Sequence, residues 1–288
     1  MVVNLSKEFI TEKILAFFPE KKLARKTKAP LWQIVKAIIY RLKTGCQWRE
    51  LPIQSFFDEV LICWQTVYYY FNSWSESGIW QKVWIQFLAH EKSCLDLSSI
   101  QLDGSHTPAK RGGEAVGYQG RKKSKTTNAL FLTDKNGLPI AMSPPFAGNH
   151  NDLFEIESHF QKMLADLQLS DFSPDGLFMN ADAGFDSKKL RENCQKMGII
   201  PNIDHNKRNR KKAYYQDIID EELYKERFSV ERTNAWIDAF KILLIRFEKK
   251  SRQLGESTLF SLYTYFPKTK FLNKLILWIL YHRMGKNI

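Results

Sequence analysis

Two apolar segments of this chain each end on an aspartate, and this repeated pattern constrains the fold more than any other feature. Residues 98–106 alternate apolar and polar side chains, reach Asp103 and break at Gly104. Residues 176–182 form an apolar run that ends on Asp182. Both patterns predict a β-strand with a carboxylate at its exit, where the sheet holds the backbone and the side chain stays accessible. Asp-Gly alone is also a common turn, so the interpretation depends on the rest of the chain.

Asp186 competes with Asp182 for the second of these positions. Asp186 or Ser187 stands where the N-cap of a helix over residues 188–197 belongs, and capping explains Asp186 fully. Asp182 lies at the strand end and has no predicted capping role. We therefore predict that Asp182 is the functional carboxylate.

The middle of the chain predicts three neighbouring antiparallel strands. Residues 128–133 and 138–142 have strand composition, and the Asn-Gly pair between them is a strong hairpin signal. Together with the strand before Asp103 they form the predicted sheet. An amphipathic helix capped by Asn151 or Asp152 follows.

Two basic loops accompany these strands. Residues 110–125 contain six cations and one acid, and their glycines permit a close approach to a phosphate chain. Residues 205–212 contain five cations and no acid. A charge run of this kind is also often only a solvated tether. We predict DNA contacts from Arg121, Lys122, Lys123, Lys207, Arg208 and Arg210.

Residues 1–95 show helical periodicity and almost no strand signal. We predict helices over residues 30–45, with Pro30 at its start and Gly45 at its end, over residues 66–77 with Thr66 as N-cap, and over residues 79–88. In the second helix, Val67, Tyr70, Phe71 and Trp74 should face the core, whereas Tyr68, Tyr69, Asn72 and Ser73 should face outward.

This helical part fits a helix-turn-helix-like DNA-binding domain, with Tyr68 and Tyr69 as DNA contacts. A plain helical bundle that covers the next domain or forms a dimer contact explains the same pattern equally well. A basic cluster could contact phosphates, although such runs are usually solvated surface. Its members are Lys21, Lys22, Arg25, Lys26 and Lys28.

A third acid follows the second basic loop. Tyr224, Arg227 and Glu231 are spaced i, i+3 and i+7, which places them on one face of a helix. A surface ion pair between Arg227 and Glu231, worth only about 0.3–0.5 kcal/mol, explains part of this spacing but not Tyr224. We therefore predict that Glu231 is functional and that Tyr224 and Arg227 contact DNA. The opposite, apolar face should pack on a sheet through Phe228, Trp236, Phe240, Leu243, Leu244 and Phe247.

Charge and cysteine content narrow the function and the compartment. The net charge of +12 points to a polyanionic partner, with nucleic acid first among the candidates. The four cysteines show no Cys-x-x-Cys spacing and no disulfide framework. The charged N-terminus excludes a signal peptide, and the apolar run at 271–280 is too short to cross a membrane. We expect a cytoplasmic, nucleoid-associated protein.

Carboxylates at two strand ends and on one helix are what a two-metal site needs. Mg²⁺ prefers oxygen ligands, and carboxylates bridge two ions about 3.5–4 Å apart. We predict two Mg²⁺ ions, with Mn²⁺ able to substitute, bound by Asp103, Asp182 and Glu231. A histidine-metal nuclease is conceivable, but its histidines lack tight ligand spacing. They are His106, His150 and His205.

The chain resembles bacterial insertion-sequence DDE transposases, in particular the insertion-sequence-five-like group. Any one of the matching segments is weak, but together they are specific and span most of the chain. They are YRLKTGCQWRELP at 40–52, TVYYYF at 66–71, DGS at 103–105, ADAGFD at 181–186 and VERTNAW at 230–236.

This resemblance implies an α/β fold in two parts. Residues 96–288 would form an RNase H-like, retroviral-integrase-like catalytic core, preceded by an all-α, helix-turn-helix-like domain at residues 1–95. The core would carry Asp103, Asp182 and Glu231 as its acidic triad, and the first domain would bind the terminal inverted repeats of the element.

The implied activity is Mg²⁺-dependent cleavage at the element ends and transfer of the freed 3′-hydroxyl into target DNA. The partners would be double-stranded DNA and a second copy of the chain, because two ends must be brought together. The alternatives are an RNase H-like endonuclease without strand transfer and a DNA-binding protein that has lost catalysis. One departure is that Asp238 stands where the family signature has a lysine.

Overall fold

The structure is a computed structural model that describes residues 5–18, 28–57, 61–206 and 219–264. Several residues predicted to contact phosphates, and the apolar run at 271–280, lie outside the described residues. The phosphate-contact residues concerned are Lys21, Lys22, Arg25, Lys26, Lys207, Arg208 and Arg210.

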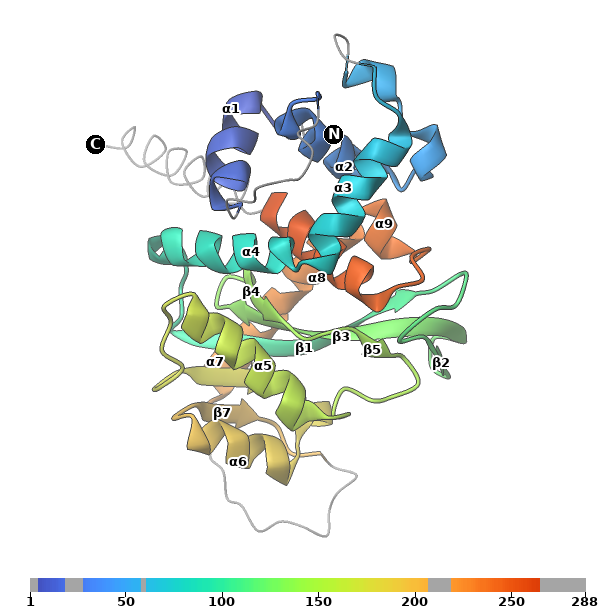
Figure 1. The fold of residues 1–288 in the computed structure, drawn as a ribbon. Coiled ribbons are helices and arrows are strands. Elements are labelled where there is room, and N and C mark those ends of the chain that lie inside the picture. Colours follow the sequence, from blue (N-terminus) through green and yellow to red (C-terminus); the bar gives the residue numbers. More distant parts are fainter. Residues whose placement is uncertain (1–4, 19–27, 58–60, 207–218, 265–288) are drawn as a thin grey trace, which may run out of the picture.

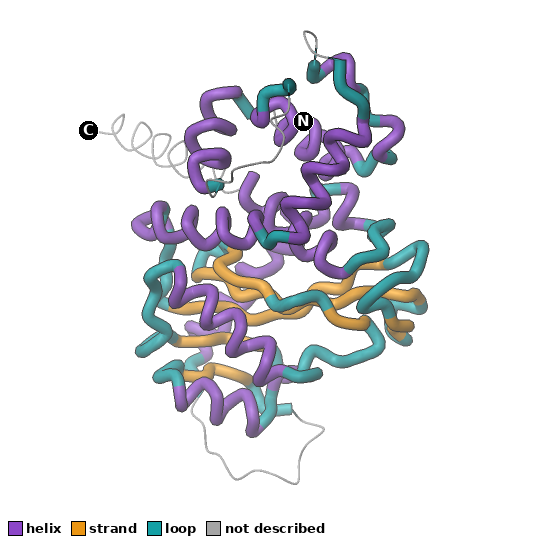
Figure 2. Tube along the Cα trace, viewed as in Figure 1, coloured by secondary structure: helices purple, strands orange, loops and turns teal. Residues whose placement is uncertain are grey.

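A helical region stands on a mixed sheet that carries helices on both faces (Figures 1 and 2). The helical region ends at Cys94, and the first strand begins at Ser99. The helical region contains α1 (Lys7–Phe9), η1 (Ile10–Ile14), η2 (Leu15–Phe17), α2 (Leu31–Thr44), η3 (Trp48–Glu50), η4 (Ile53–Ser55), α3 (Trp64–Glu76), α4 (Ile79–His90) and η5 (Lys92–Cys94).

The three predicted N-terminal helices are α2, α3 and α4. Pro30 precedes α2 as its N-cap, and Gly45 ends it with a φ of 67°, a conformation that favours glycine. α3 begins two residues earlier than predicted, and Cys63 rather than Thr66 is its N-cap. The predicted inward residues of α3 are buried, namely Val67, Tyr70, Phe71 and Trp74.

The sheet has seven strands with the order β2-β3-β1-β6-β7, and β4 and β5 also pair with β3. β1 runs antiparallel to β3 and parallel to β6, which is parallel to β7. The predicted hairpin is β3–β4, with Gly137 in its turn at a φ of 76°. The strands are β1 (Ser99–Pro108), β2 (Gly117–Gln119), β3 (Ser124–Asp134), β4 (Pro139–Met142), β5 (Phe146–Ala147), β6 (Phe178–Ala181) and β7 (Ile200–Ile203).

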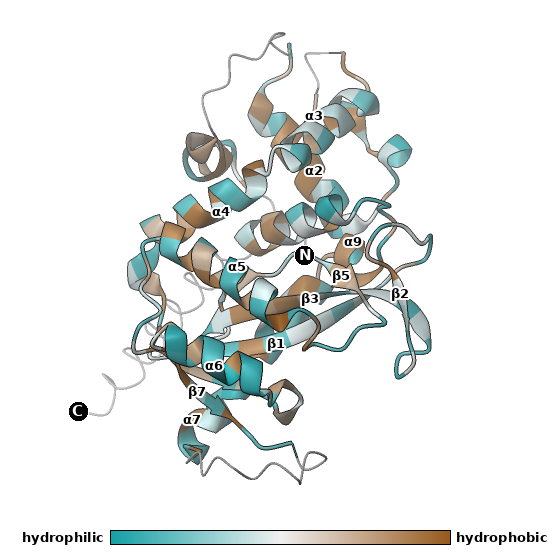
Figure 3. Ribbon diagram, turned by 60° about the horizontal axis from the view of Figure 1, so that its bottom comes forward, coloured by the Kyte–Doolittle hydropathy of each residue, from teal (hydrophilic) through white to brown (hydrophobic). Residues whose placement is uncertain are grey.

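Helices cover both faces of the sheet. In Figure 1, α5 (Ile156–Leu169) and α6 (Lys188–Lys196) lie in front of it, and Figure 3 shows the hydrophilic outer side of α6. The other face carries α7 (Glu221–Lys225), η8 (Glu226–Ser229), α8 (Val230–Asp238), α9 (Lys241–Leu244) and a helix over residues 251–264. The predicted cap of α5 was wrong, because α5 begins at Ile156 with Glu155 as N-cap.

The helix over residues 251–264 packs against the N-terminal helices. Glu256 Oε2 accepts a 3.0 Å hydrogen bond from the Trp80 amide at the start of α4. The Trp80 ring stacks on Phe260 with a centroid distance of 3.8 Å. Buried apolar residues of both regions form one continuous core. The end of the sheet region therefore anchors the N-terminal helices, and a domain boundary after residue 95 stays a prediction.

Ionisation of Glu256 is expected to make the fold less stable as the pH rises. Burial raises the pKa of its carboxyl from 4.5 to about 7, although hydrogen bonds from the Trp80 and Gln81 amides lower it. Between these values the folded chain holds a proton that the unfolded chain has released, so the free energy of unfolding falls as the pH rises. The loss should reach about 3 kcal/mol above the folded-state pKa. Urea titrations across this range measure it.

Glu256→Gln is the control, because it keeps the side-chain shape and removes the titration. The free energy of unfolding of the wild type, relative to this variant, should decrease from acid to neutral pH. Below the unfolded-state pKa both states are protonated and the difference should level off. A difference that is constant over the whole range would contradict the prediction.

No helix within the described ranges is long and apolar enough to cross a membrane. The four cysteines are all free thiols, as their sequence spacing predicted. Only Cys194 is buried, in α6.

Candidate active site

The parallel pairing of β1 with β6 brings Asp103 and Asp182 to the same place. Leu102 is in register with Ala181, so Asp103 and Asp182 are the next residues of the two neighbouring segments. Asp182 directly follows β6, as predicted, but the predicted strand end at Asp103 is wrong, because β1 continues through Gly104 to Pro108 by pairing with β3. Residues in register across a parallel pair point to the same face of the sheet. Burial raises the pKa of Asp103 to about 6, and the nearby carboxylates of Asp152 and Asp182 add to this rise.

Asp182 has a capping role that its sequence position did not predict. Its Oδ1 accepts a 2.7 Å hydrogen bond from the Gly184 amide and caps η6 (Ala183–Phe185). The prediction of no capping role was therefore wrong, because the chain turns into a 3₁₀ helix directly after β6. The cap fixes the carboxylate of Asp182 at the strand end while the residue remains half-buried.

Asp186 is occupied by structural contacts. Its Oδ1 accepts hydrogen bonds from Arg191 Nε at 3.1 Å and Nη2 at 3.0 Å. Its Oδ2 accepts a third from the Asn206 amide at 3.0 Å. Ser187 caps α6 instead, accepting a hydrogen bond from the Leu190 amide. Asp186 thus ties α6 to the chain after β7.

Helix α8 carries Glu231 and packs against β1. Asn234 lies one turn after Glu231 and donates a 3.4 Å hydrogen bond to Asp103 Oδ2, which is long for this type of bond. Residues three apart share one side of a helix, so Glu231 and Asn234 lie on the same side of α8. Glu231 itself is exposed.

The β3–β4 turn holds α8 in this position. Thr233 Oγ1 donates a 2.6 Å hydrogen bond to the Gly137 carbonyl. A Cβ atom on Gly137 would overlap the Ser229 carbonyl oxygen, so this close approach requires glycine. The turn of the predicted Asn-Gly hairpin therefore also packs against α8 and binds it through Thr233.

The donor set of this site suits a hard cation, but the three acids do not form a closed metal cage. Among the described residues, no three His, Cys, Asp or Glu side chains are grouped closely enough to hold a metal ion. Carboxylates repel one another unless a cation neutralises them. Asp103 and Asp182 are together, and the exposed Glu231 would have to turn toward them.

The predicted single helix over Tyr224, Arg227 and Glu231 is wrong. The chain passes from α7 through the 3₁₀ turn η8 into α8, and each change of helix type shifts the faces. The Arg227 guanidinium lies 5.5 Å from the Tyr224 ring and 4.7 Å from the Phe228 ring. The predicted buried apolar face is also wrong in part, because Phe228, Leu244 and Phe247 are exposed by 61%, 45% and 47%.

The basic hairpin between β2 and β3 lies near the end of β1. Arg121, Lys122 and Lys123 are exposed at its tip, and Lys123 has a φ of 46°. Burial lowers the pKa of His106, and the charges of Lys122 and Arg121 lower it further. Lys122 and Arg121 are therefore close enough to influence the charge of His106, which lies on β1 three residues after Asp103.

The histidine-metal alternative finds no support in the described residues. His106 Nδ1 is 3.1 Å from Thr126 Oγ1, and His150 stacks on Phe154 with a centroid distance of 3.7 Å. His205 lies 3.9 Å from Asp186. The three rings have separate partners and form no group.

The face of α3 that was predicted to point outward is only partly exposed to solvent. Tyr69 is 64% exposed, whereas Tyr68 packs edge-on against Trp48 and is 37% exposed. Asn72 was predicted to face outward, but its Oδ1 accepts a 2.8 Å hydrogen bond from Gln253. This face of the helix is thus shared between solvent and the helix over residues 251–264.

Sequence reasoning missed the role of Asp152, which it took for a helix cap. Asp152 Oδ1 accepts a 2.6 Å hydrogen bond from Asn128 Nδ2. It also lies where a Cβ atom on Gly104 would be. Because neighbouring strand residues point to opposite faces, Asp152 lies across β1 from the side chain of Asp103. Asn128 follows four polar residues of β3, so no clear sequence signal pointed to this contact.

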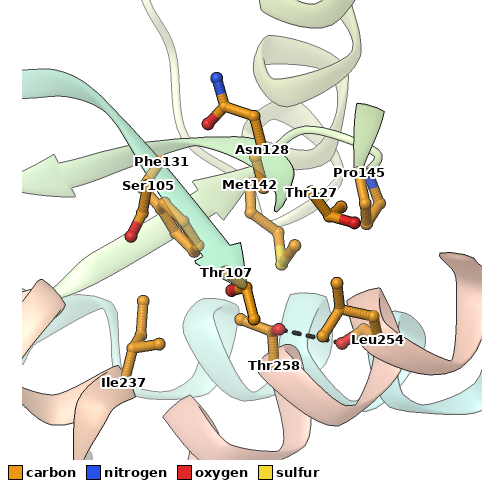
Figure 4. A pocket seen from close by; sticks show the side chains of 11 residues that line it. Ser105, Thr107, Thr127, Asn128, Phe131, Met142, Pro145, Ile237, Leu254 and Thr258 are labelled. Carbon is orange, nitrogen blue, oxygen red and sulfur yellow. Dashed lines mark hydrogen bonds between the residues drawn. The ribbon is translucent and has the colours of Figure 1, made fainter. Parts of the chain in front are cut away.

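A cavity of about 20 Å³ lies between β1, β3, α8 and the helix over residues 251–264 (Figure 4), which is room for about one water molecule. In Figure 4, Ser105 and Thr107 point toward these helices, and Asn128 points away from them. This cavity is too small to hold a substrate.

Two family models match the chain in succession. Residues 11–84 match a family described as a putative transposase of the IS4/5 family. Residues 89–262, which are more than half of the chain, match the transposase DDE domain. The chain belongs to the DDE transposases.

One relative comes from an insertion element. The chain is 28% identical over 82 residues to an uncharacterized 16.2 kDa protein of insertion element IS402 from Burkholderia cepacia. That match covers 28% of the chain and about half, 53%, of the relative.

A piggyBac transposase, solved as a synaptic complex with hairpin DNA, aligns over 90% of this chain and 73% of its own. The TM-score is 0.51 at 10% identity, which supports the RNase H-like fold alone. A Mos1 transposase paired-end complex, at 9% identity, covers 76% of this chain and 80% of its own, but its TM-score of 0.28 is too low to bear on the fold.

Proposed function

We propose that this transposase cleaves DNA at the inverted-repeat ends of an insertion sequence and transfers the freed 3′-hydroxyl into target DNA. The observation that carries the proposal is the register of β1 and β6, which sets Asp103, in the middle of β1, beside Asp182, directly after β6. Glu231 on α8 would complete the acidic triad. An acidic site of this kind in a member of the DDE family favours metal-dependent phosphodiester chemistry.

Asp103, Asp182 and Glu231 would hold the metal through carboxylate oxygens. When bound, two Mg²⁺ ions, with Mn²⁺ able to substitute, supply Lewis-acid stabilisation for an in-line displacement at phosphorus. The chain's own contribution is to hold these oxygens in place. The Gly184 amide orients Asp182, and Asn234 orients Asp103.

The proposed DNA surface surrounds these acids. It combines the basic hairpin with the segment before Glu231, and cationic side chains bind phosphates without reading sequence. We propose that residues 1–95 bind the inverted repeats, that residues 96–288 are the catalytic part, and that a homodimer joins two ends. The proposed contact residues are Arg121, Lys122, Lys123, Tyr224, Arg227, Tyr68, Tyr69 and, outside the described residues, Lys207, Arg208 and Arg210.

The test is cleavage of DNA that carries the ends flanking the gene. Purified protein with Mg²⁺ should cut at the element end, and Asp182→Asn should lower the rate by at least about 10³-fold because a metal ligand is lost. Asp186→Asn is the matched control and keeps the hydrogen bond to Arg191. It should stay within about tenfold of the wild type. Sequencing gels read both products.

The outcome separates the alternatives. Cleavage without joined products in the presence of target DNA would favour an endonuclease. Tight end binding without cleavage in Mg²⁺ or Mn²⁺ would leave a DNA-binding protein. Equal losses in the two variants would contradict the choice of Asp182 over Asp186.

A further inference from the structure

Three buried amide side chains form a row across three parallel strands. Gln101 of β1 is in register with Asn180 of β6, which is in register with Asn202 of β7. Gln101 and Asn180 are fully buried, and Asn202 is 4% exposed. Because the three residues are in register, their side chains point to the same face of the sheet.

Hydrogen bonds connect the row end to end. Asn202 Nδ2 donates to Asn180 Oδ1 at 2.8 Å, and Asn180 Nδ2 donates to Gln101 Oε1 at 2.9 Å. Gln101 Nε2 then donates to Ser99 Oγ at 2.9 Å, and Ser99 Oγ donates to Glu226 Oε2 at 2.6 Å. The chain of bonds begins at the edge strand and ends on η8.

Each of the three strands also forms a hydrogen bond with the segment over residues 220–226. Asn202 exchanges two 3.0 Å hydrogen bonds with the backbone of Asp220. Asn180 donates a 2.9 Å bond to the Leu223 carbonyl, and Ser99 bonds Glu226. The three bonded residues of this segment are spaced three apart, so they lie on one side of its helical turns.

Buried amides are costly unless every group finds a partner, and apolar side chains would fill the same space without that requirement. A connected polar row in a core therefore favours one specific arrangement over sliding alternatives. The arrangement it fixes here is the segment over residues 220–226. That segment leads directly into Arg227 and Glu231.

We propose that the row of Gln101, Asn180 and Asn202 positions the segment that carries Arg227 and Glu231 relative to Asp103 of β1 and to Asp182, which follows β6. The proposal rests on the proposed function in one respect, namely that Glu231 acts together with Asp103 and Asp182. The three amides touch no substrate and are positioning residues. Their effect on the reaction passes through the placement of α8.

The experiment compares amide exchange in two row variants and one matched control. Asn180→Leu removes the bonds with Gln101, Asn202 and Leu223, and Asn202→Leu removes the bond with Asn180 and both bonds with Asp220. Asn193→Leu is the control, because Asn193 is also buried at 4% exposure, but it bonds Glu157 and Lys189 in another part of the fold. Hydrogen–deuterium exchange is measured on peptides covering residues 219–231 and 99–103, without DNA or metal.

Exchange in residues 219–231 should become about tenfold faster in each row variant and remain unchanged in the control. Exchange in residues 99–103 should stay protected in all three variants. Unaltered protection of residues 219–231 in both row variants would overturn the proposal. Asn202→Asp keeps the side-chain shape and the acceptor for the Asp220 amide, and it replaces any leucine variant that does not fold.

Cleavage kinetics provide the second measurement. The row variants should lose about 10²-fold in kcat, because small misplacements of acting groups cost that much, while Kd for end DNA stays within about threefold. A loss of kcat no larger than in the control would overturn the positioning role. If the wild type does not cleave at all, the proposed function fails, and the exchange result alone decides whether the row holds the segment.

Discussion

Asp103→Asn is expected to reduce the rate of DNA-end cleavage by at least about 10³-fold. A carboxylate ligand contributes several kcal/mol of stabilisation to a charged transition state, and each 1.36 kcal/mol is a factor of ten. End binding should stay within about threefold, because the proposed phosphate contacts lie elsewhere. The free energy of unfolding should not fall, since burial already raises the pKa of Asp103 and disfavours its charge. Cleavage rates, DNA titrations and urea unfolding measure the three quantities.

Asp152→Asn is the matched control for this prediction. Asp152 contributes to the raised pKa of Asp103 from the opposite face of β1, so the variant removes a nearby charge without removing a proposed ligand. It should also keep the hydrogen bond with Asn128. We expect a loss of at most about tenfold. Losses of equal size in both variants would indicate that the site requires negative charge in general and not Asp103 in particular.

The sequence was sufficient to predict the strand that contains Asp103 and the strand before Asp182, because each signal is local, although β1 continues past the predicted break at Gly104. Alternation before Asp103, the apolar run before Asp182 and the Asn-Gly pair at the hairpin are all read within a few residues. Their proximity in space was also predictable in principle. β1 and β6 run parallel, so residues in register on the two strands are neighbours, and so are the aspartates that follow Leu102 and Ala181.

The sequence could not predict contacts that depend on distant segments. The helical spacing of Tyr224, Arg227 and Glu231 suggested one helix, but η8 interrupts it where Glu226 is held by Ser99 and by Lys135. Spacing alone does not reveal such a tertiary contact.

The capping residues were predicted incorrectly for a related reason. The sequence assigned a cap to Asp186 or Ser187 and none to Asp182. Several polar residues in succession can each cap a turn, and tertiary partners decide among them. Asp186 accepts a hydrogen bond from Arg191, and Ser187 therefore caps α6 instead. Asp182 then caps the short turn before it.

Arg41→Met is expected to lower the free energy of unfolding by about 3–5 kcal/mol. Arg41 Nη2 lies 2.9 Å from Glu248 Oε1, and the two side chains are only 6% and 5% exposed. Removing the cation leaves the Glu248 carboxylate buried without its partner, and this loss is larger than the net value of the pair. The variant also loses the contact of the guanidinium with the Trp48 ring at 4.2 Å. Urea unfolding measures the change.

The double variant Arg41→Met/Glu248→Leu separates a lost ion pair from a stranded charge. Replacing both partners by apolar groups should restore stability to within about 1 kcal/mol of the wild type, because buried pairs contribute little beyond their own desolvation. Arg41 lies on α2 and Glu248 lies between α9 and the helix over residues 251–264, so the pair joins the proposed DNA-end-binding helices to the catalytic part. If the single and double variants are equally unstable, packing around Arg41 matters more than its charge. If neither is destabilised, other contacts hold the two parts together, among them the stacking of Trp80 on Phe260.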